Sequence, residues 1–427
     1  ERQSLLYVDR IFLHERTGSV ALNSLLEHGR PVRRRQHAFC TMDHIVDTIP
    51  GRSDDTLMPS GRDFIVATRS AARETGIQLF DIQDPDQGIV HVISPELGIA
   101  LPGLSLICPD SHTCTLGGLG VLAWGVGSTE AEHALATSTL RVTRPQTMRV
   151  QFIGSMAEHV TAKDLILYTI RSLSASGGAG YAIEFAGPAI VALPVESRLT
   201  LCNMATELSA FTGLIAPDEQ VIDYCQGRPF APRGVAWEAA IRHWQTLQSD
   251  ADAQFDSEHR IDIGSLKPQL TWGTSPQHCI DWDEEIPGAG EAPDEATAAS
   301  WQQAQAYMGV TAGHRLSDYP LDAAFIGSCT NSRLSDLRDA ASYLTQTGHC
   351  VAKGVKALCV PGSGRVKRAA EAEGIDAVFR QAGFEWREPG CSMCFFAGGE
   401  RCGSLPPPIA IFRDVRVWVS ERILAVR

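Results

Sequence analysis

The sequence predicts an α/β fold that is divided into about three domains. Short apolar runs alternate along the chain with amphipathic helical patterns, as is typical of parallel strands joined by helices. The length of 427 residues corresponds to about three domains at roughly 150 residues each. No repeat of solenoid period is visible in the sequence. We therefore expect several separate α/β units.

Composition and charge exclude several classes of protein. Hydrophobic residues make up 44% and charged residues 20% of the chain, which argues against a disordered or coiled-coil protein. The net charge of -13 makes a nucleic acid an unfavourable partner. No apolar run approaches the roughly 20 residues that a membrane span requires. The 12 cysteines are scattered, so we expect free thiols and a cytoplasmic location. The first four residues resemble no signal peptide and lack an initiator Met, so we expect a segment to precede them.

The first half of the chain contains three clear element patterns. Residues 104–108 form a short apolar run followed by a polar and then a Gly-rich stretch, which predicts a strand. Residues 128–140 predict a helix, with Thr129 and Glu132 spaced as a capping box. Residues 161–164 repeat that start signal ahead of an amphipathic segment at 165–173.

The second half repeats the alternation of strand and helix. Apolar runs at 323–326 and 356–360 predict strands, and helical patterns follow them at 335–344 and 366–373. Between the two halves, residues 281–295 combine acidic side chains with Pro and Gly, which predicts a surface loop or linker.

The most specific pattern is the placement of three cysteines. Cys329 follows the predicted strand at 323–326, and Cys391 and Cys394 form a C-x-x-C pair further along. Three thiolates suit a [4Fe–4S] cluster with one iron that lacks a protein ligand, and such an iron can act as a Lewis acid. Spacing alone leaves two alternatives open, namely a zinc site with Cys402 or a His as fourth ligand and a set of inert buried thiols.

Two Asp–His motifs are candidates for acid–base chemistry. Asp43 directly precedes His44, and Asp110-Ser111-His112 follows the predicted strand at 104–108. A carboxylate can orient or charge a nearby imidazole, and such pairs are the usual proton-transfer groups. Asp110 and Cys329 both follow apolar runs, and open α/β sheets bind ligands at the carboxyl ends of their strands. This convergence favours one shared site, although each His taken singly is typical of a structural residue.

Three further residues are weaker candidates. His91 has no adjacent carboxylate, so a hydrogen-bonded structural role is favoured when it is considered alone. Asn203 and Glu207 lie four residues apart and are expected to share a helix face. That face is either solvated or, because its neighbours are apolar, buried.

Three other motifs predict no site. Residues 118–123 match the letters of a dinucleotide fingerprint but start too far from the preceding strand and lack the acidic residue. Residues 361–364 could bind an anion at a helix start, although a plain strand-to-helix turn is at least as well supported. His14-Glu15 lacks the second His of a zinc-protease motif.

Taken together, four motifs resemble the aconitase superfamily, and within it most closely the large subunits of the isopropylmalate dehydratases. The motifs are Thr41-Met-Asp-His44, Asp110-Ser-His-Thr113, Gly327-Ser-Cys-Thr-Asn-Ser-Arg333 and Pro389-Gly-Cys-Ser-Met-Cys394. The likeness runs from about Leu5 to Cys402. It implies an aconitase-like three-domain α/β/α architecture around a central cleft. We place the domains at residues 1–147, 148–268 and 269–404, followed by an atypical tail at 405–427.

The resemblance also implies a mechanism. Cys329, Cys391 and Cys394 would hold a [4Fe–4S] cluster whose open iron binds a small dicarboxylic hydroxy acid. His44, backed by Asp43, would protonate the leaving hydroxyl. His91 and His112, with Asp110 and Glu207, would order water and hydroxyl. Ser111 and Asn203 are the further candidate site residues. A separate small subunit would supply a serine base, so a heterodimer is expected.

The chain departs from the family pattern towards its end. The family carries Ser-Asn-Arg-Asn-Phe-x-Gly-Arg-Gln-Gly and later Arg-Thr-His-Leu, whose arginines bind substrate carboxylates, and this chain has neither. A one-base shift through the possible codons of residues 408–418 permits Asn-Arg-Asn-Phe-(Pro or Ser)-Gly-Arg-Gln-Gly. We therefore hypothesise that the tail from about Leu405 is a frameshifted reading, which the coding DNA would test. The alternative is a genuine divergent tail with a strand at 415–419.

The missing arginines leave three functional hypotheses. The first is the isomerisation of isopropylmalates in leucine biosynthesis. The second is a non-catalytic cluster-binding relic, because losing charge-assisted carboxylate contacts weakens substrate binding. The third is a related hydro-lyase, a homoaconitase or an alkylmalate dehydratase.

Overall fold

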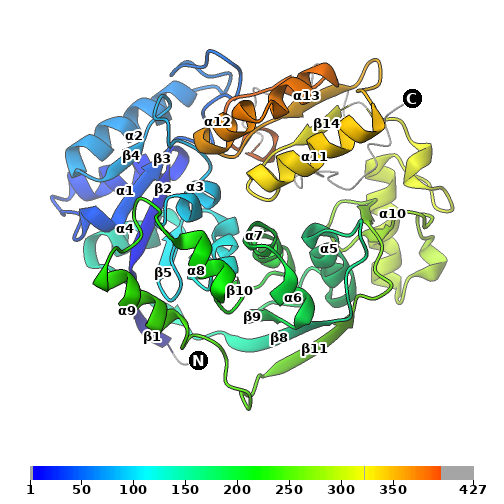
Figure 1. Ribbon diagram of the computed structural model, residues 1–427, viewed down its shortest axis with the longest axis horizontal. Coiled ribbons are helices and arrows are strands. Elements are labelled where there is room, and N and C mark those ends of the chain that lie inside the picture. The colour runs from blue at the N-terminus through cyan, green and yellow to red at the C-terminus, as the bar shows by residue number, and fades with distance from the viewer. Residues whose placement is uncertain (1–2, 322, 396–427) are drawn as a thin grey trace.

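The computed structural model describes residues 3–321 and 323–395 and confirms the α/β class. Three sheets made of parallel strands carry helices against their faces (Figure 1). The predicted tail at 405–427 and the candidate ligand Cys402 lie outside the described residues. The domain limits given above stay a prediction, and the first of them falls inside strand β8 (Gln146–Ile153).

The first sheet contains five parallel strands in the order β4-β3-β2-β5-β6. Alternate residues of its central strands point to opposite faces. Leu13 of β2 packs with helices α1, α2 and α4, whereas Phe12 and Phe39 pack with α3, α7 and α8 on the other face. Burial on both faces explains the continuous apolar runs of these strands. The strands are β2 (Arg10–His14), β3 (Ala38–Thr41), β4 (Gln78–Phe80), β5 (Ser105–Cys108) and β6 (Leu122–Gly125).

The helices around the first sheet are α1 (Glu15–Glu27), α2 (Gly61–Thr75), α3 (Val90–Glu96) and α4 (Ser128–Thr137), with the 3-10 segments η1 (Arg35–His37) and η2 (Ser111–Leu119). The antiparallel pair β1 (Gln3–Tyr7) and β7 (Thr139–Thr143) lies beside them. The predicted helix at 128–140 ends early because residues 139–143 form β7. The predicted cap was wrong: Glu130, not Glu132, accepts the N–H of the N-cap residue Gly127.

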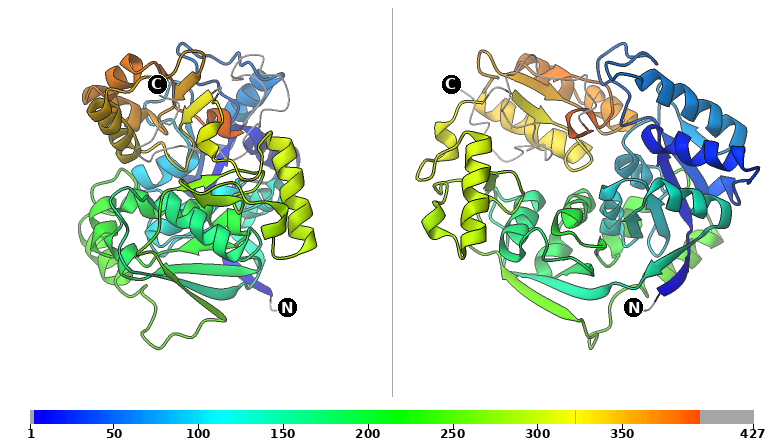
Figure 2. Two further views of the ribbon diagram at one scale, coloured as in Figure 1. Left: turned by 90° about the vertical axis from the view of Figure 1, so that its right-hand side faces the viewer. Right: turned by 180° about the vertical axis from the view of Figure 1, so that it is seen from behind.

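The second sheet has four parallel strands in the order β10-β9-β8-β11. Met148, Val150 and Phe152 of β8 pack against α5, while the residues between them are partly exposed. Figure 2 shows the ribbon of this sheet from two further directions. The predicted capping box at Thr161 and Asp164 is confirmed at the start of α5. The elements in this part of the chain are β9 (Tyr181–Ala186), β10 (Thr212–Leu214), β11 (Ser257–Asp262), α5 (Ala162–Leu173), α6 (Pro188–Ala192), α7 (Val195–Asn203), η3 (Met204–Leu208), α8 (Glu219–Cys225) and α9 (Val235–Trp244). Of these, α8 and α9 pack in the core of the first sheet.

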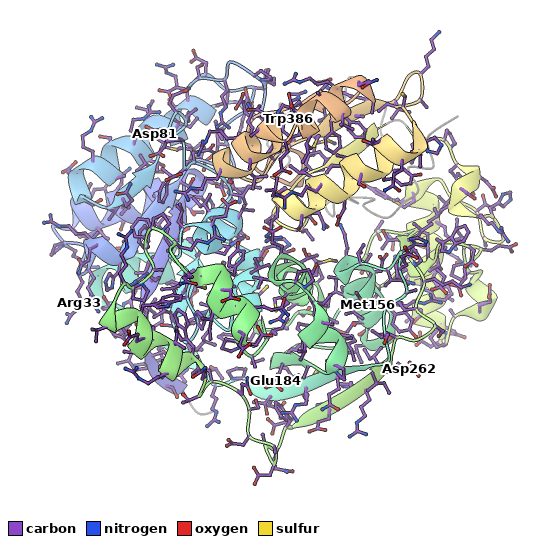
Figure 3. The ribbon with its side chains drawn as sticks, viewed as in Figure 1. Arg33, Asp81, Met156, Glu184, Asp262 and Trp386 are labelled. Carbon is purple, nitrogen blue, oxygen red and sulfur yellow. The ribbon has the colours of Figure 1, made fainter. Side chains whose placement is uncertain are left out.

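The third sheet, in the order β14-β15-β16, confirms the strands predicted at 323–326 and 356–360. Trp386 marks this unit in Figure 3, and its indole packs on Phe379. Its elements are β14 (Ala323–Ile326), β15 (Lys356–Cys359), β16 (Glu385–Trp386), α11 (Leu334–Thr347), α12 (Gly364–Ala372), α13 (Ile375–Gln381) and η6 (Ser392–Phe395). A smaller unit precedes it, with β12 (Gln269–Thr271), β13 (Cys279–Asp281), η4 (Ala289–Glu291), α10 (Glu295–Met308) and η5 (Leu316–Asp318).

The turn at 361–364 connects the first and third units through backbone contacts. Gly88 forms a bridge with Ser363, and the Ile89 N–H donates to the Gly362 carbonyl at 2.8 Å. The nearby cations are paired, because Arg365 binds Asp86 and Lys367 binds Glu388. Among the described residues, no helix is long and apolar enough to cross a membrane.

A buried carboxyl at this junction predicts a pH-dependent stability. Burial raises the pKa of Glu96 to about 7, and its Oε2 has no hydrogen-bond partner. The unfolded carboxyl ionises near the usual glutamate pKa of 4.5 while the folded one stays protonated, so the free energy of unfolding falls as pH rises from 4.5 to about 7. Glu96→Gln should remove that fall and stabilise the chain at pH 8 by on the order of 1–3 kcal/mol. Urea unfolding at pH 5 and pH 8 measures this effect.

The exposed Glu238 of α9 provides the matched control, since Glu238→Gln changes the same group in contact with solvent. The control variant should have the same free energy of unfolding as the parent at pH 5 and at pH 8. The same result for Glu96→Gln would contradict the assignment of the pH effect to Glu96.

Candidate functional site

The loop after β3 carries the first Asp–His pair. Asp43 is fully buried, and it accepts from His44 Nδ1 at 2.6 Å and from the Val90 N–H at 3.0 Å. The other ring nitrogen of His44, Nε2, lies 3.2 Å from Asp110. His44 therefore has a carboxylate at each nitrogen. The motif was predicted from sequence, but the second carboxylate comes from another strand.

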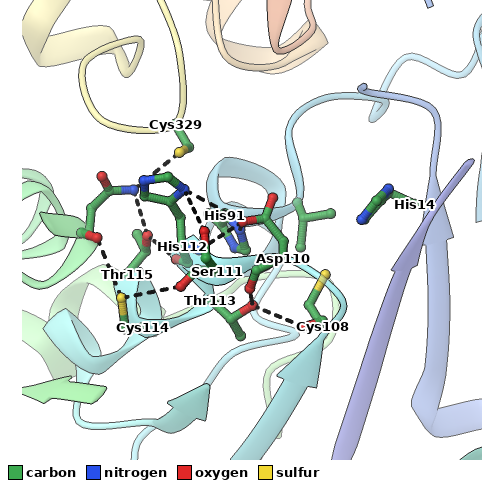
Figure 4. A network of polar contacts seen from close by, with 12 residues as sticks. His14, His91, Cys108, Asp110, Ser111, His112, Thr113, Cys114, Thr115 and Cys329 are labelled. Atoms are coloured by element: carbon green, nitrogen blue, oxygen red, sulfur yellow. Dashed lines mark hydrogen bonds and ion pairs between the residues drawn. The ribbon is translucent and has the colours of Figure 1, made fainter. Parts of the chain in front are cut away.

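Asp110 is the centre of the site (Figure 4). It follows β5, and its Oδ1 accepts the His112 N–H at 2.7 Å as the N-cap of η2. The same carboxylate lies 3.4 Å from His91 Nε2 and 3.6 Å from His112 Nδ1. With His44, three imidazoles thus converge on one carboxylate. His91, the weakest candidate when considered alone, is fully buried against this group.

His112 connects Asp110 to the remaining acid. Its Nε2 lies 3.6 Å from Glu207, and the exposed Ser111 hydroxyl lies 3.5 Å from its Nδ1. Glu207 does not lie on one continuous helix with Asn203 as predicted, because α7 ends at Asn203 and Glu207 belongs to the 3-10 segment η3. Both residues nevertheless face the site.

Asn203 joins the histidine cluster to the first cysteine. Its fully buried amide donates to Thr115 Oγ1 at 2.8 Å and to Cys329 Sγ at 3.1 Å, while its oxygen accepts from Thr330 at 2.8 Å. Figure 4 shows Cys329 at the tip of its loop, above His112. The loop after β14 therefore places the thiol of Cys329 next to the acid–base cluster.

The C-x-x-C turn places Cys391 next to His44 and Cys394 near Cys329. The Cys391 N–H donates to the Asp43 carbonyl at 2.7 Å, and Cys391 Sγ lies 3.9 Å from His44 Nδ1. Burial raises the pKa of Cys391 well above its usual value and that of Cys394 to about 11. Burial thus opposes ionisation of these two thiols, and a bound metal centre would favour their thiolate forms.

The donor set fits a cluster better than a single zinc ion. Thiolates on one tetrahedral zinc at about 2.3 Å lie roughly 3.8 Å apart. Among the described residues, the three cysteine sulfurs form no group within 4.8 Å of one another. Cluster ligands bind different irons and are spaced more widely. Ser328 (φ 74°) and Ser392 (φ 50°), beside Cys329 and Cys391, have the left-handed backbone conformation, which non-glycine residues rarely adopt.

The charged groups of the cluster shift one another's pKa values. Burial opposes ionisation of Asp110, but the three histidines outweigh it and hold its pKa well below the usual range. Burial likewise opposes the charged form of His44, yet Asp43, with Cys391 and Asp110, holds the pKa of His44 well above its usual value. The pKa of His112 is also raised well above its usual value against burial, by Cys329, Asp110 and Glu207. The site therefore combines protonated imidazoles with ionised carboxylates.

The sequence patterns missed His14 and Glu15, which the structure brings into the site. His14 ends β2, and its ring stacks on His44 with the centroids 3.9 Å apart. Its Nε2 lies 3.0 Å from the Pro109 carbonyl, whereas Nδ1 has no hydrogen-bond partner. Burial, and then the nearby His44, lower the pKa of His14 to about 4, so it stays neutral. The useful signal was its position at a strand end, not a zinc-protease motif.

Glu15 binds the main chain of the loop that carries His44. The fully buried carboxylate accepts the N–H groups of Asp43 at 3.0 Å, of Val46 at 3.1 Å and of Ile45. His14, Glu15, Asp43 and His44 place their ligand atoms within 4.8 Å of one another. The hydrogen bonds above already occupy both carboxylates, which disfavours a metal ion at this point.

The comparison with known proteins decides the family. Residues 1–409 match the aconitase family (aconitate hydratase). The chain belongs to the aconitase family. It is 51% identical over 403 residues to the 3-isopropylmalate dehydratase large subunit 1 of Bradyrhizobium diazoefficiens, covering 94% of this chain and 83% of that protein. A solved structure, the holo form of aconitase X from Thermococcus kodakaraensis, is 12% identical with a TM-score of 0.47 and covers 91% of this chain and 80% of that chain.

Proposed function

We propose that this chain is the large subunit of a 3-isopropylmalate dehydratase, a hydro-lyase that interconverts 2- and 3-isopropylmalate by loss and return of water. The observation that carries the proposal is the 51% identity over 94% of the chain to such a subunit. The convergence of three histidines on Asp110 beside Cys329 supports it, because dehydration requires groups that deliver and accept protons.

In this proposal Cys329, Cys391 and Cys394 would hold one [4Fe–4S] cluster. When bound, the cluster supplies a Lewis acid through an iron that lacks a protein ligand. The proposed set contains three cysteine ligands from two loops, with Cys391 beside His44 and Cys394 near Cys329. Asn203 orients the Cys329 sulfur by donating to it at 3.1 Å.

The acid–base groups have separate proposed roles. His44 holds protons at Nδ1 towards Asp43 and at Nε2 towards Asp110, so its imidazolium can protonate a departing hydroxyl. Asp110 keeps His91 and His112 oriented, and Glu207 faces the far nitrogen of His112. Neutral His14 covers the His44 ring and excludes water from that face. Ser111 contributes an exposed hydroxyl beside His112.

The proposal includes a cytoplasmic heterodimer with a small subunit that provides the base for the carbon-bound proton. The relative's designation as a large subunit supports such a partner. We also keep, as part of this proposal, the hypothesis that the tail from about Leu405 is a shifted reading of a substrate-binding arginine motif.

Anaerobic reconstitution tests the function. The chain is loaded with iron and sulfide, combined with the small subunit of the Bradyrhizobium relative, and supplied with 3-isopropylmalate while the unsaturated diacid is followed by ultraviolet absorbance. Formation of that diacid is the expected result. A loaded chain without turnover would identify a non-catalytic relic, and preference for homocitrate-type or alkylmalate substrates would identify a related hydro-lyase.

A further inference from the structure

The turn that carries Cys391 belongs to the third unit but is held by the first. No strand pairing joins the two sheets in the described part of the chain. The contact is made by loops instead. The Glu388 N–H donates to the Thr48 carbonyl at 2.7 Å, and the Cys391 N–H donates to the Asp43 carbonyl at 2.7 Å. The segment in orange that leads to this turn lies against the first unit in Figure 1.

Two side chains cross-link this junction. Arg52 donates through Nη1 to the Pro389 carbonyl and, at 3.4 Å, to the Asp47 carbonyl. Its Nη2 donates to the Ile82 carbonyl at 3.3 Å and to Gln87 Oε1 at 2.6 Å. The guanidinium fork therefore connects three loops, a task that its fixed geometry suits and a lysine cannot reproduce.

Gln87 completes the cross-link from a fully buried position. Its amide donates to the Met42 carbonyl, directly before Asp43, and to the Pro389 carbonyl at 3.3 Å. Space at the turn is also limited, since a Cβ at Gly390 would lie 3.0 Å from Thr48 Cγ2. The main chain on both sides of His44 and the main chain before Cys391 are thus tied to the same two side chains.

We infer that Arg52 and Gln87 are positioning residues that lock the Cys391 turn onto the loop bearing Asp43 and His44. This inference rests on the proposed function for its catalytic meaning, but the locking itself is a property of the cluster-free chain. With the lock in place, the Cys391 sulfur and the His44 ring keep one relative geometry. Without it, the two units can separate locally while each keeps its own core.

The test is amide hydrogen exchange on the full cluster-free chain carrying Arg52→Lys or Gln87→Glu. Arg52→Lys keeps the charge and loses the fork, and Gln87→Glu keeps the shape and loses both amide donors. Exchange at residues 387–394 and 42–48 should accelerate by about tenfold or more, because several hydrogen bonds that close the junction are lost. Exchange within α5 should stay at the parent rate.

Arg69→Lys is the matched control. Arg69 forms a comparable fork on the same unit, with Asp54 and with the Asp81 labelled in Figure 3. The Arg69→Lys variant should show the parent rate of amide hydrogen exchange at residues 387–394. Parent-like exchange at 387–394 in both test variants would overturn the inference, and so would acceleration that extends equally through α5.

Kinetics of the reconstituted heterodimer give a second readout. Because neither side chain is placed at the substrate, kcat should fall about tenfold while KM changes less than about threefold. A rise in KM at constant kcat would contradict positioning. If the parent shows no turnover, the proposed function fails, whereas the exchange experiment still decides the positioning role.

Discussion

Asp110→Asn is expected to lower kcat of the reconstituted enzyme by about 100- to 10,000-fold. One carboxylate lies 3.2–3.6 Å from three imidazoles, so neutralising it removes the charge that keeps His44 and His112 protonated and His91 oriented. Asn is as good an N-cap as Asp, and the hydrogen bond from the His112 N–H can persist. The substitution therefore removes charge while it preserves the start of η2.

Two measurements separate this effect from misfolding. Iron content should equal that of the parent, and imidazole nitrogen shifts of labelled histidine should report loss of the doubly protonated ring at neutral pH. Asp294→Asn, which changes the exposed N-cap of α10, should leave both readouts and kcat unchanged. Retention of parental kcat by Asp110→Asn would reject Asp110 as the centre of the site.

Cys391→Ala is expected to lower the iron and sulfide retained per chain by about tenfold or more after anaerobic reconstitution. Cys391 is one of only three proposed ligands, and its backbone N–H is held by the Asp43 carbonyl, so no neighbouring thiol can take its place without moving the turn. Visible absorbance and iron analysis measure the loss. Cys329→Ala and Cys394→Ala should behave alike.

Cys359→Ala is the control for this series. Cys359 is a fully buried thiol of the same unit, at the end of β15, and its carbonyl accepts the Arg387 N–H. Its removal perturbs the core without touching the proposed ligands, so the cluster should form normally. Equal iron loss in Cys359→Ala and Cys391→Ala would indicate that packing, and not ligation, controls cluster retention.

Much of the fold could be predicted from local patterns. The strands at 323–326 and 356–360 and the capping box at Thr161 are set by apolar runs and by short-range hydrogen bonds that the sequence displays directly. The helix predicted at 128–140 was too long because β7 takes over at Thr139, where pairing with the distant β1 outweighs local helical preference. Glycine at the cap of α4 carried no side-chain signal at all.

The alternating α/β pattern, the three candidate cysteines and the Asp–His motifs at strand ends can be read from the chain, because each is contained in a few adjacent residues. Three features required the folded structure: Asp110 contacts three histidines, His14 and Glu15 belong to the site, and Arg52 and Gln87 hold the Cys391 turn. The physical reason is that β2, β3 and β5 are neighbours in one parallel sheet although residues 14, 43 and 110 are far apart in the chain. Their strand ends meet at one edge, where side chains from separate segments share charges and hydrogen bonds.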